Sequence, residues 1–274
     1  MSKKNIAFIM PYFGKWPDWF ELFLLSCSKN INIDWYFFTD CGTPEITYKN
    51  TVFKDISFDN YKKLVSDRLG ISFNPNNAYK LCDLKPFYGY IHSNILESYE
   101  FYGFGDIDVI YGDIAKFITK DMMKKYNVIS ASDDIVCGYF CLFKNIRMIR
   151  ESCFKIKNWQ QLLEDDNHRR VDEGRYTEVL IKSARKNWLV KFLKNFFSPI
   201  RRNNLFIEQH STPLSYKQWW DKSDIFPTEW RWYDGKLTNN KDGDREFLYL
   251  HFMNWKSNKY YFIKKDGLKV NGEA

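Results

Sequence analysis

The chain has 274 residues, which suits one large α/β domain or a domain with a small appendage. Hydrophobic residues make up 45% of it and aromatic residues 19%, so the composition excludes a disordered chain and predicts a packed core. Lysine and arginine outnumber aspartate and glutamate, 41 against 34, which favours an anionic partner such as a nucleotide, a nucleic acid or a membrane surface.

The six cysteines argue against a disulfide scaffold and against structural zinc. None of them forms a Cys-x-x-Cys pair, and no histidine lies at zinc-finger spacing from them. No apolar stretch approaches the roughly 20 residues that a membrane-spanning helix needs. The cysteine pattern fits free thiols in a reducing cytoplasm best, so we expect a cytoplasmic protein. The short apolar run near the N-terminus predicts a first strand, not a signal peptide.

Strands alternate with helices through much of the chain, beginning with the apolar strand Ile6–Met10 and a helix for which Asp18 is the expected N-cap. Further strands are expected over 34–38, 52–53, 128–131, 139–143 and 247–252, and helices over 61–69, 78–92 (kinked near Pro86) and 171–181. This order predicts a largely parallel, wound sheet in a single α/β domain covering residues 1–256. Within it, 185–245 is expected to be an irregular, aromatic and basic insertion facing the acceptor or a membrane, and 257–274 a basic tail.

Two carboxylates, Asp106 and Asp108, lie at the end of an apolar, glycine-containing stretch, and we expect a buried strand that carries both of them. Residues i and i+2 of a strand point to the same side, and ligands of open α/β sheets bind beyond the carboxyl ends of the strands. Because isolated buried charges are costly, such a pair suits a hard divalent cation, Mg²⁺ or Mn²⁺, that would neutralise a diphosphate. The alternative is that the pair caps a turn.

Four motifs together resemble a known group of enzymes: PYFG at 11–14, KLCDLKP at 80–86, GDIDVIYGDI at 105–114 and HFMNWK at 251–256. In this combination the chain is similar to nucleotide-sugar-dependent glycosyltransferases of the GT-A fold, and to bacterial GT-A-like proteins associated with capsule and O-antigen synthesis. The resemblance implies a GT-A-type, Rossmann-like domain with a mostly parallel mixed sheet. It also implies transfer of a sugar from a nucleotide sugar, with UDP preferred, to a saccharide or lipid-linked saccharide acceptor.

The same resemblance implies roles for individual residues in the donor site. His251 would complete the metal shell of Asp106 and Asp108, and Lys256 would contact the diphosphate; the alternative for His251 is an ordinary strand histidine. The residues expected to contact the nucleotide are Pro11, Tyr12, Phe13, Gly14, Thr39, Asp40, Lys80, Asp83, Lys85 and Asp106. Lys85 stands where related enzymes have an arginine. Tyr12 could instead pack internally, and Asp40 could be a turn residue.

The candidate catalytic carboxylates are Asp133, Asp134, Asp172 and Glu173. An inverting transferase needs one carboxylate as general base for the acceptor hydroxyl, whereas a retaining enzyme needs none, so the stereochemistry stays open. Asp172 and Glu173 could equally stabilise a helix N-terminus.

Two stretches have both a functional and a structural interpretation. The aromatic residues of 216–235 could stack on sugar rings or pack a subdomain. In 185–202, apolar residues at helical spacing are flanked by lysines and arginines, which is typical of an interfacial helix on anionic lipid but also of a core helix with a basic edge. The first interpretation would place the protein at the inner face of the plasma membrane.

Two other classes of function remain as alternatives. A sugar-nucleotide nucleotidyltransferase usually opens with a glycine-rich loop, and the PYFG loop argues against it. A non-catalytic nucleotide- or nucleic-acid-binding protein would fit the basic charge, but the sequence contains no recognisable nucleic-acid module, so we expect no nucleic-acid partner.

Overall fold

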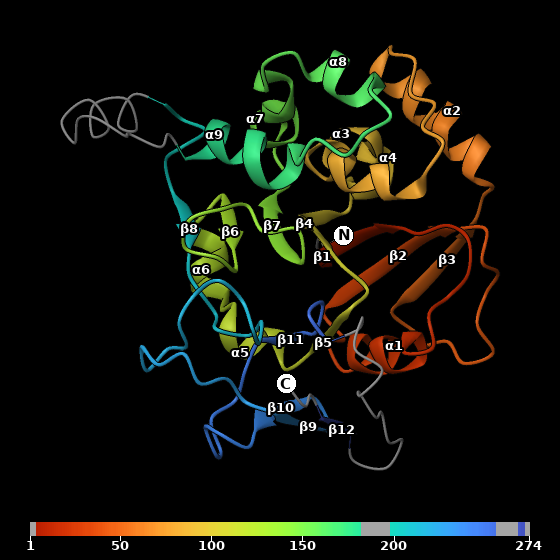
Figure 1. The fold of residues 1–274 in the computed structure, drawn as a ribbon. Helices are drawn as coiled ribbons and strands as arrows, with labels where there is room; N and C mark the ends of the chain where they lie inside the picture. Colours follow the sequence, from red (N-terminus) through yellow and green to blue (C-terminus); the bar gives the residue numbers. More distant parts are fainter. Residues whose placement is uncertain (1–3, 182–197, 256–267, 272–274) are drawn as a thin grey trace.

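The computed structural model describes residues 4–181, 198–255 and 268–271, and it confirms the predicted α/β class. A seven-stranded mixed sheet in the order β3-β2-β1-β4-β7-β6-β8 runs through the centre of the molecule (Figure 1). Its strands are β1 (Lys4–Pro11), β2 (Ile33–Thr39), β3 (Thr51–Asp55), β4 (Tyr99–Gly105), β6 (Val128–Ser130), β7 (Phe140–Lys144) and β8 (Asn204–Phe206). The four strands β3, β2, β1 and β4 are parallel, β7 is antiparallel to both of its neighbours, and β6 and β8 are parallel.

Helices cover both faces of this sheet, which explains why its central strands are apolar throughout. Ala7 and Ile9 of β1 pack toward one set of helices, and Phe8 and Met10 toward the other. The first set consists of α2 (Phe58–Leu69), the 3₁₀ helix η1 (Ala78–Phe87), α3 (Tyr88–Ile91), α4 (Ser93–Leu96), α7 (Arg147–Arg150), the 3₁₀ helix η2 (Glu151–Lys155), α8 (Trp159–Glu164), the π-helix η3 (Val171–Arg175) and α9 (Tyr176–Leu180). The second consists of α1 (Phe20–Ser28), α5 (Ile114–Phe117) and α6 (Lys120–Lys125), on the opposite side in Figure 1.

Helix boundaries follow local capping in one case and depart from the prediction in another. Ser57 accepts a hydrogen bond from the backbone N–H of Asn60 at the start of α2, and Gly70, with φ 66°, ends that helix in the left-handed conformation. By contrast, α1 has Trp19 at its N-cap position and no side-chain cap, so the predicted cap at Asp18 is wrong. The backbone N–H of Phe20 bonds instead to the carbonyl of Pro17.

The segment that carries the paired carboxylates leaves the central sheet. After β4 the chain bends through Asp106 and Asp108 and forms β5 (Val109–Tyr111), which pairs antiparallel with β11 (Tyr249–His251). The backbone N–H of Phe252 donates to the carbonyl of Asp108 at 3.1 Å, and the indole N–H of Trp19 to that of Ile107 at 3.0 Å. The two carboxylates therefore lie in a bend between strands, and their predicted place within a strand is wrong.

The C-terminal quarter is more regular than the sequence predicted. β8 joins the central sheet, and β9 (Glu229–Tyr233), β10 (Lys236–Asn239) and β12 (Leu268–Asn271), the last in the predicted tail, form a second sheet. Trp219, Trp230 and Trp232 are buried in a separate hydrophobic cluster, which confirms the packing alternative for these side chains. The predicted amphipathic stretch lies mostly outside the described residues, as does Lys256. Within the described ranges, none of the helices has the length and apolar character that a bilayer crossing requires.

Candidate active site

A cavity of about 990 Å³ lies beyond the carboxyl ends of β1 and β4 and reaches to β11. Part of the predicted site lines it: Pro11, Tyr12, Phe13, Lys85, Asp106, Asp108, Asp172, Glu173 and His251. These residues come from five separate segments of the chain. The sheet edge and the β5–β11 pairing are what bring them together.

Asp106, Asp108 and His251 form a compact group of potential metal ligands. One ligand atom from each lies within 4.8 Å of the others, and the imidazole Nε2 of His251 is 3.6 Å from Oδ1 of Asp108. Asp108 and His251 are 5% and 3% exposed. The imidazole ring packs on Tyr139, with the ring centroids 4.4 Å apart, and its Nδ1 lies 3.4 Å from the hydroxyl of Thr212. Two carboxylates and an oriented imidazole are a donor set that fits a divalent cation.

Lys85 fixes a positive charge beside this group. Its ammonium donates to Oδ1 of Asp106 at 2.6 Å and to the carbonyl of Gly138 at 3.0 Å, and it lies 3.8 Å from Oδ2 of Asp172. Burial lowers the pKa of Lys85, but Asp106, Cys82 and Asp172 outweigh burial and hold the pKa well above its usual value. The lysine is therefore charged throughout the physiological range.

Asp172 and Glu173 differ in environment although they are adjacent in η3. Burial raises the pKa of Asp172 to about 7, even though Lys85 lowers it. Among the described residues, Oδ1 of Asp172 has no hydrogen-bond partner. Glu173 is half-buried and accepts a hydrogen bond from the guanidinium of Arg170 at 3.2 Å. The carboxyl group of Asp172 thus has a pKa near neutral pH, whereas the carboxylate of Glu173 is paired with Arg170.

Lys80 and Asp83 lie beneath the cavity and do not line it. Both side chains are fully buried, and Lys80 Nζ is 2.9 Å from Oδ2 of Asp83. Lys80 also donates to the carbonyls of Leu162 and Asn167, while Asp83 accepts from the backbone N–H groups of Arg169 and Val171. Their burial argues against the predicted contact with a nucleotide. Instead they attach η1 to the segment that leads into η3.

Asp83, His168 and Asp172 form a second group of potential ligands, whose donor atoms also lie within 4.8 Å of one another. Two ammonium groups already neutralise its carboxylates, because Lys80 pairs with Asp83 and Lys85 lies near Asp172. A cation placed here would be repelled by both lysines, whereas of these two only Lys85 contacts the first group, through Asp106. The first group is therefore the better cation site.

The loop after β1 forms one wall of the cavity. The ring of Tyr12 stacks on Trp16, with centroids 5.3 Å apart, and Phe13 is buried against Tyr61. Gly14, at φ 107°, donates its backbone N–H to Oδ1 of Asp40 at 2.8 Å. The hydroxyl of Thr39 accepts from the backbone N–H of Cys41. Gly14, Thr39 and Asp40 do not line the cavity, so the structure gives Asp40 the turn role that the sequence left open.

The lining of the cavity also contains residues that the sequence did not single out. The ammonium of Lys217 contacts Asp133, Asp134 (2.7 Å) and Glu208 (2.9 Å), and Lys217 and Glu208 line the cavity. Asp133 and Asp134 do not line it, which argues against either as the catalytic base. Other lining residues that the sequence missed are Tyr79, Cys82, Tyr139, His168 and Arg170, whereas Tyr216, which also lines the cavity, belongs to the aromatic stretch that the sequence indicated. Lys217 and Asp133 are 84 positions apart, and no local pattern in the sequence indicates such a pair.

Comparison with known proteins assigns the chain to a family. It belongs to a family of unknown function (DUF6625), whose sequence profile matches residues 8–271. No curated protein matches the sequence.

Similar solved structures include two glycosyltransferases. The galactosyltransferase LgtC, solved with donor and acceptor sugar analogues, is 12% identical with a TM-score of 0.36, and the match covers 64% of this chain and 70% of LgtC. The apo form of the glycosyltransferase GlyE from Streptococcus pneumoniae TIGR4 is 13% identical with a TM-score of 0.33. That match covers 66% of this chain and 44% of GlyE.

Proposed function

We propose that this protein is a metal-dependent glycosyltransferase that takes its sugar from a nucleotide-sugar donor. The observation that carries the proposal is the convergence of Asp106, Asp108 and His251 beside Lys85 in one cavity. Glycosyl transfer from a nucleotide sugar requires that the negative charge of the departing diphosphate be stabilised. This cavity offers both a cation site and a fixed ammonium for that purpose.

Asp106, Asp108 and His251 would hold the divalent cation, and the mixed oxygen and nitrogen donors favour Mn²⁺ over Mg²⁺. When bound, such a cation supplies Lewis-acid stabilisation of the diphosphate leaving group. Lys85 contributes a charge that is fixed by its bonds to Asp106 and Gly138. Lys256, five residues beyond His251, is proposed as a second diphosphate contact.

The nucleoside of the donor is proposed to lie against Pro11, Tyr12 and Phe13, which form the wall next to the β1 end. The resemblance of the sequence motifs favours UDP as the nucleotide. Asp172 and Glu173 are proposed to meet the sugars, because both line the cavity and Asp172 is 3.8 Å from Lys85. In an inverting reaction, one of them would accept the proton of the acceptor hydroxyl.

The acceptor is proposed to be a saccharide or a lipid-linked saccharide used in surface polysaccharide synthesis, as in capsule or O-antigen. The exposed aromatic rings of Tyr79 and Tyr216 line the cavity and offer faces on which a sugar could stack. The enzyme would act in the cytoplasm or at the inner face of the plasma membrane. The chemistry proposed for the donor site is compatible with both locations.

A panel of UDP-, GDP- and dTDP-sugars, each of which carries a diphosphate leaving group, tests the proposal. With Mn²⁺ present and no acceptor, we expect slow release of the nucleoside diphosphate from at least one donor, with the release abolished by a chelator. A nucleotidyltransferase would instead form pyrophosphate from a nucleoside triphosphate and a sugar phosphate. A non-catalytic binding protein would bind nucleotides without turning any of them over.

A further inference from the structure

A second cavity, of about 530 Å³, lies apart from the active site, and no residue that the structure describes lines both cavities. It is formed where the end of η2, the start of α8, the helical segment η3–α9 and the turn before β8 meet. Four cationic side chains line it: Lys155, Lys157, Arg175 and Arg201. Among the described lining residues Glu178 is the single acidic one, so these residues together carry a formal charge of +3.

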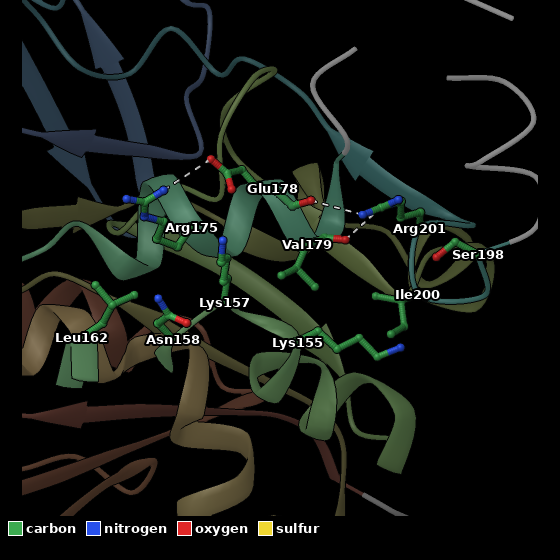
Figure 2. Close-up of a pocket in the computed structure, with 10 residues that line it drawn as sticks. All are labelled: Lys155, Lys157, Asn158, Leu162, Arg175, Glu178, Val179, Ser198, Ile200 and Arg201. Atoms are coloured by element: carbon green, nitrogen blue, oxygen red, sulfur yellow. Dashed lines mark hydrogen bonds and ion pairs between the residues drawn. The ribbon is translucent and has the colours of Figure 1, made fainter. Parts of the chain in front are cut away.

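The cations of this cavity are only partly neutralised. Figure 2 shows Arg175 and Arg201 on opposite sides, with Lys155 and Lys157 between them. Arg175 lies 3.9 Å from Glu178, a long ion pair in which both side chains are more than half exposed. Neither Lys155 nor Lys157 forms a side-chain hydrogen bond or ion pair with another described residue lining the cavity. Within the described part of the chain, two ammonium groups therefore remain available to an anion.

The guanidinium of Arg201 is held in place at one side of the cavity by two hydrogen bonds to backbone carbonyls. Its Nε donates to the carbonyl of Val179 at 2.9 Å and its NH2 to that of Glu178 at 3.2 Å, so the guanidinium is held at the end of α9 (Figure 2). Ser198 and Asn158 add polar groups, and Leu162, Val179 and Ile200 add apolar surface. The combination is a concave, preformed cationic site with a partly apolar wall, of a size suited to a small ligand.

We propose that this cavity, lined by Lys155, Lys157, Arg175 and Arg201, binds a phosphate-bearing ligand. Clustered lysines and arginines form charge-assisted hydrogen bonds with phosphate oxygens, and a diphosphate or phosphomonoester would balance the excess charge. The phosphate could belong to a soluble molecule or to the headgroup of an anionic lipid, and both present the same group to the cavity. The proposal concerns binding alone and does not depend on the glycosyltransferase assignment.

Calorimetric titration with pyrophosphate, in the absence of divalent cations, tests the proposal. The Lys155→Gln/Lys157→Gln double variant should bind at least about tenfold more weakly than the wild type, because two charge-assisted bonds are lost. The matched control is Lys54→Gln/Lys63→Gln, which changes two exposed lysines outside both cavities and should bind like the wild type. Melting curves verify that all the proteins are folded. Equal affinity in the wild type and the Lys155/Lys157 variant would overturn the proposal, as would an equal loss in the control.

Co-sedimentation with vesicles identifies the source of the phosphate. Vesicles containing phosphatidic acid present the phosphomonoester on a lipid, and vesicles of phosphatidylcholine alone serve as the neutral comparison. Binding to the acidic vesicles that depends on Lys155 and Lys157 indicates a lipid headgroup. Pyrophosphate binding without vesicle binding indicates a soluble ligand. If the wild type binds neither pyrophosphate nor the acidic vesicles, the cavity is not a phosphate site.

Discussion

The ammonium of Lys85 lies 2.6 Å from Oδ1 of Asp106 and so connects η1 to the bend that follows β4. Through the same nitrogen the lysine reaches Gly138 and approaches Asp172. One side chain thus links three segments around the proposed diphosphate position. We therefore expect both the proposed function and the local stability of the cavity to depend on it.

Replacing Lys85 by methionine should lower both stability and UDP affinity. Removal of one partner from a buried ion pair costs about 3–5 kcal/mol, and the diphosphate would lose its fixed ammonium. Urea unfolding measures the first effect and calorimetry the second. Lys54→Met, at an exposed lysine, should change neither quantity. An unchanged UDP affinity in folded Lys85→Met would remove the lysine from the donor site.

Gly138 offers a test of the same cluster without removing a charge. A Cβ at this position would lie 2.9 Å from the ammonium of Lys85 and 3.2 Å from Oδ2 of Asp172. Gly138→Ala should therefore displace both groups and weaken Mn²⁺-dependent UDP binding. The matched control is Gly174→Ala, because a Cβ at Gly174 meets nothing within 4 Å. Calorimetry on both variants decides the matter, and equal affinities would contradict the arrangement.

The raised pKa of Asp172 predicts a specific dependence of stability on pH. Its folded-state pKa of about 7 exceeds the usual value for aspartate, so the folded protein keeps a proton that the unfolded chain releases. The stabilisation is complete below about pH 4 and is lost as the pH rises to about 7, by up to about 1.4 kcal/mol per pH unit.

Urea unfolding of the metal-free protein at pH 5 and pH 8 checks this prediction. The wild type should lose more stability between the two values than Asp172→Asn does, because the amide does not titrate. A Glu178→Gln control, at an exposed carboxylate outside the active-site cavity, should behave like the wild type. Parallel pH profiles for the wild type and Asp172→Asn would mean that the carboxyl group is ionised at neutral pH.

Lys80 should matter for folding and not for ligand contact. Lys80→Met leaves the buried carboxylate of Asp83 without its ammonium, so the free energy of unfolding should fall by about 3–5 kcal/mol. The folded variant should bind UDP with nearly the wild-type affinity, since Lys80 does not line the cavity. Urea unfolding and calorimetry measure the two quantities. A large loss of UDP affinity at unchanged stability would restore the role that the sequence motif predicted.

Features of the fold and of the site that arise from local sequence patterns could be predicted from the sequence. The apolar run of β1 and the alternation of strands and helices indicated the central sheet. A strand that is buried on both faces consists almost entirely of apolar residues, and this pattern is visible in the sequence. The i, i+2 spacing indicated that Asp106 and Asp108 would meet, although a bend and not a strand brings them together. The contacts of Lys80 and Asp83 were misjudged because the KLCDLKP motif does not reveal which of its polar side chains point inward.

Long-range pairings could not be predicted from local patterns. The motif resemblance, and no local pattern, indicated that His251 would join Asp108. The two residues meet because β11 pairs with β5 in the register Val109 to His251, across 142 positions of the chain. The contacts of Lys217 with Asp133 and Asp134 likewise join segments that have no shared pattern. Such pairings are decided by the packing of the whole domain.

The central claim is that Asp106, Asp108 and His251 hold a cation that binds the donor diphosphate, and UDP calorimetry with and without Mn²⁺ tests it most directly. In the wild type, Mn²⁺ should raise UDP affinity at least about tenfold, or about 1.4 kcal/mol, and a chelator should reverse the gain. Asp108→Asn should remove the gain while the protein stays folded, and Asp121→Asn, at a side chain that is 92% exposed, should retain it. Equal UDP affinity with and without Mn²⁺ in the wild type, or the full gain in folded Asp108→Asn, would contradict the claim.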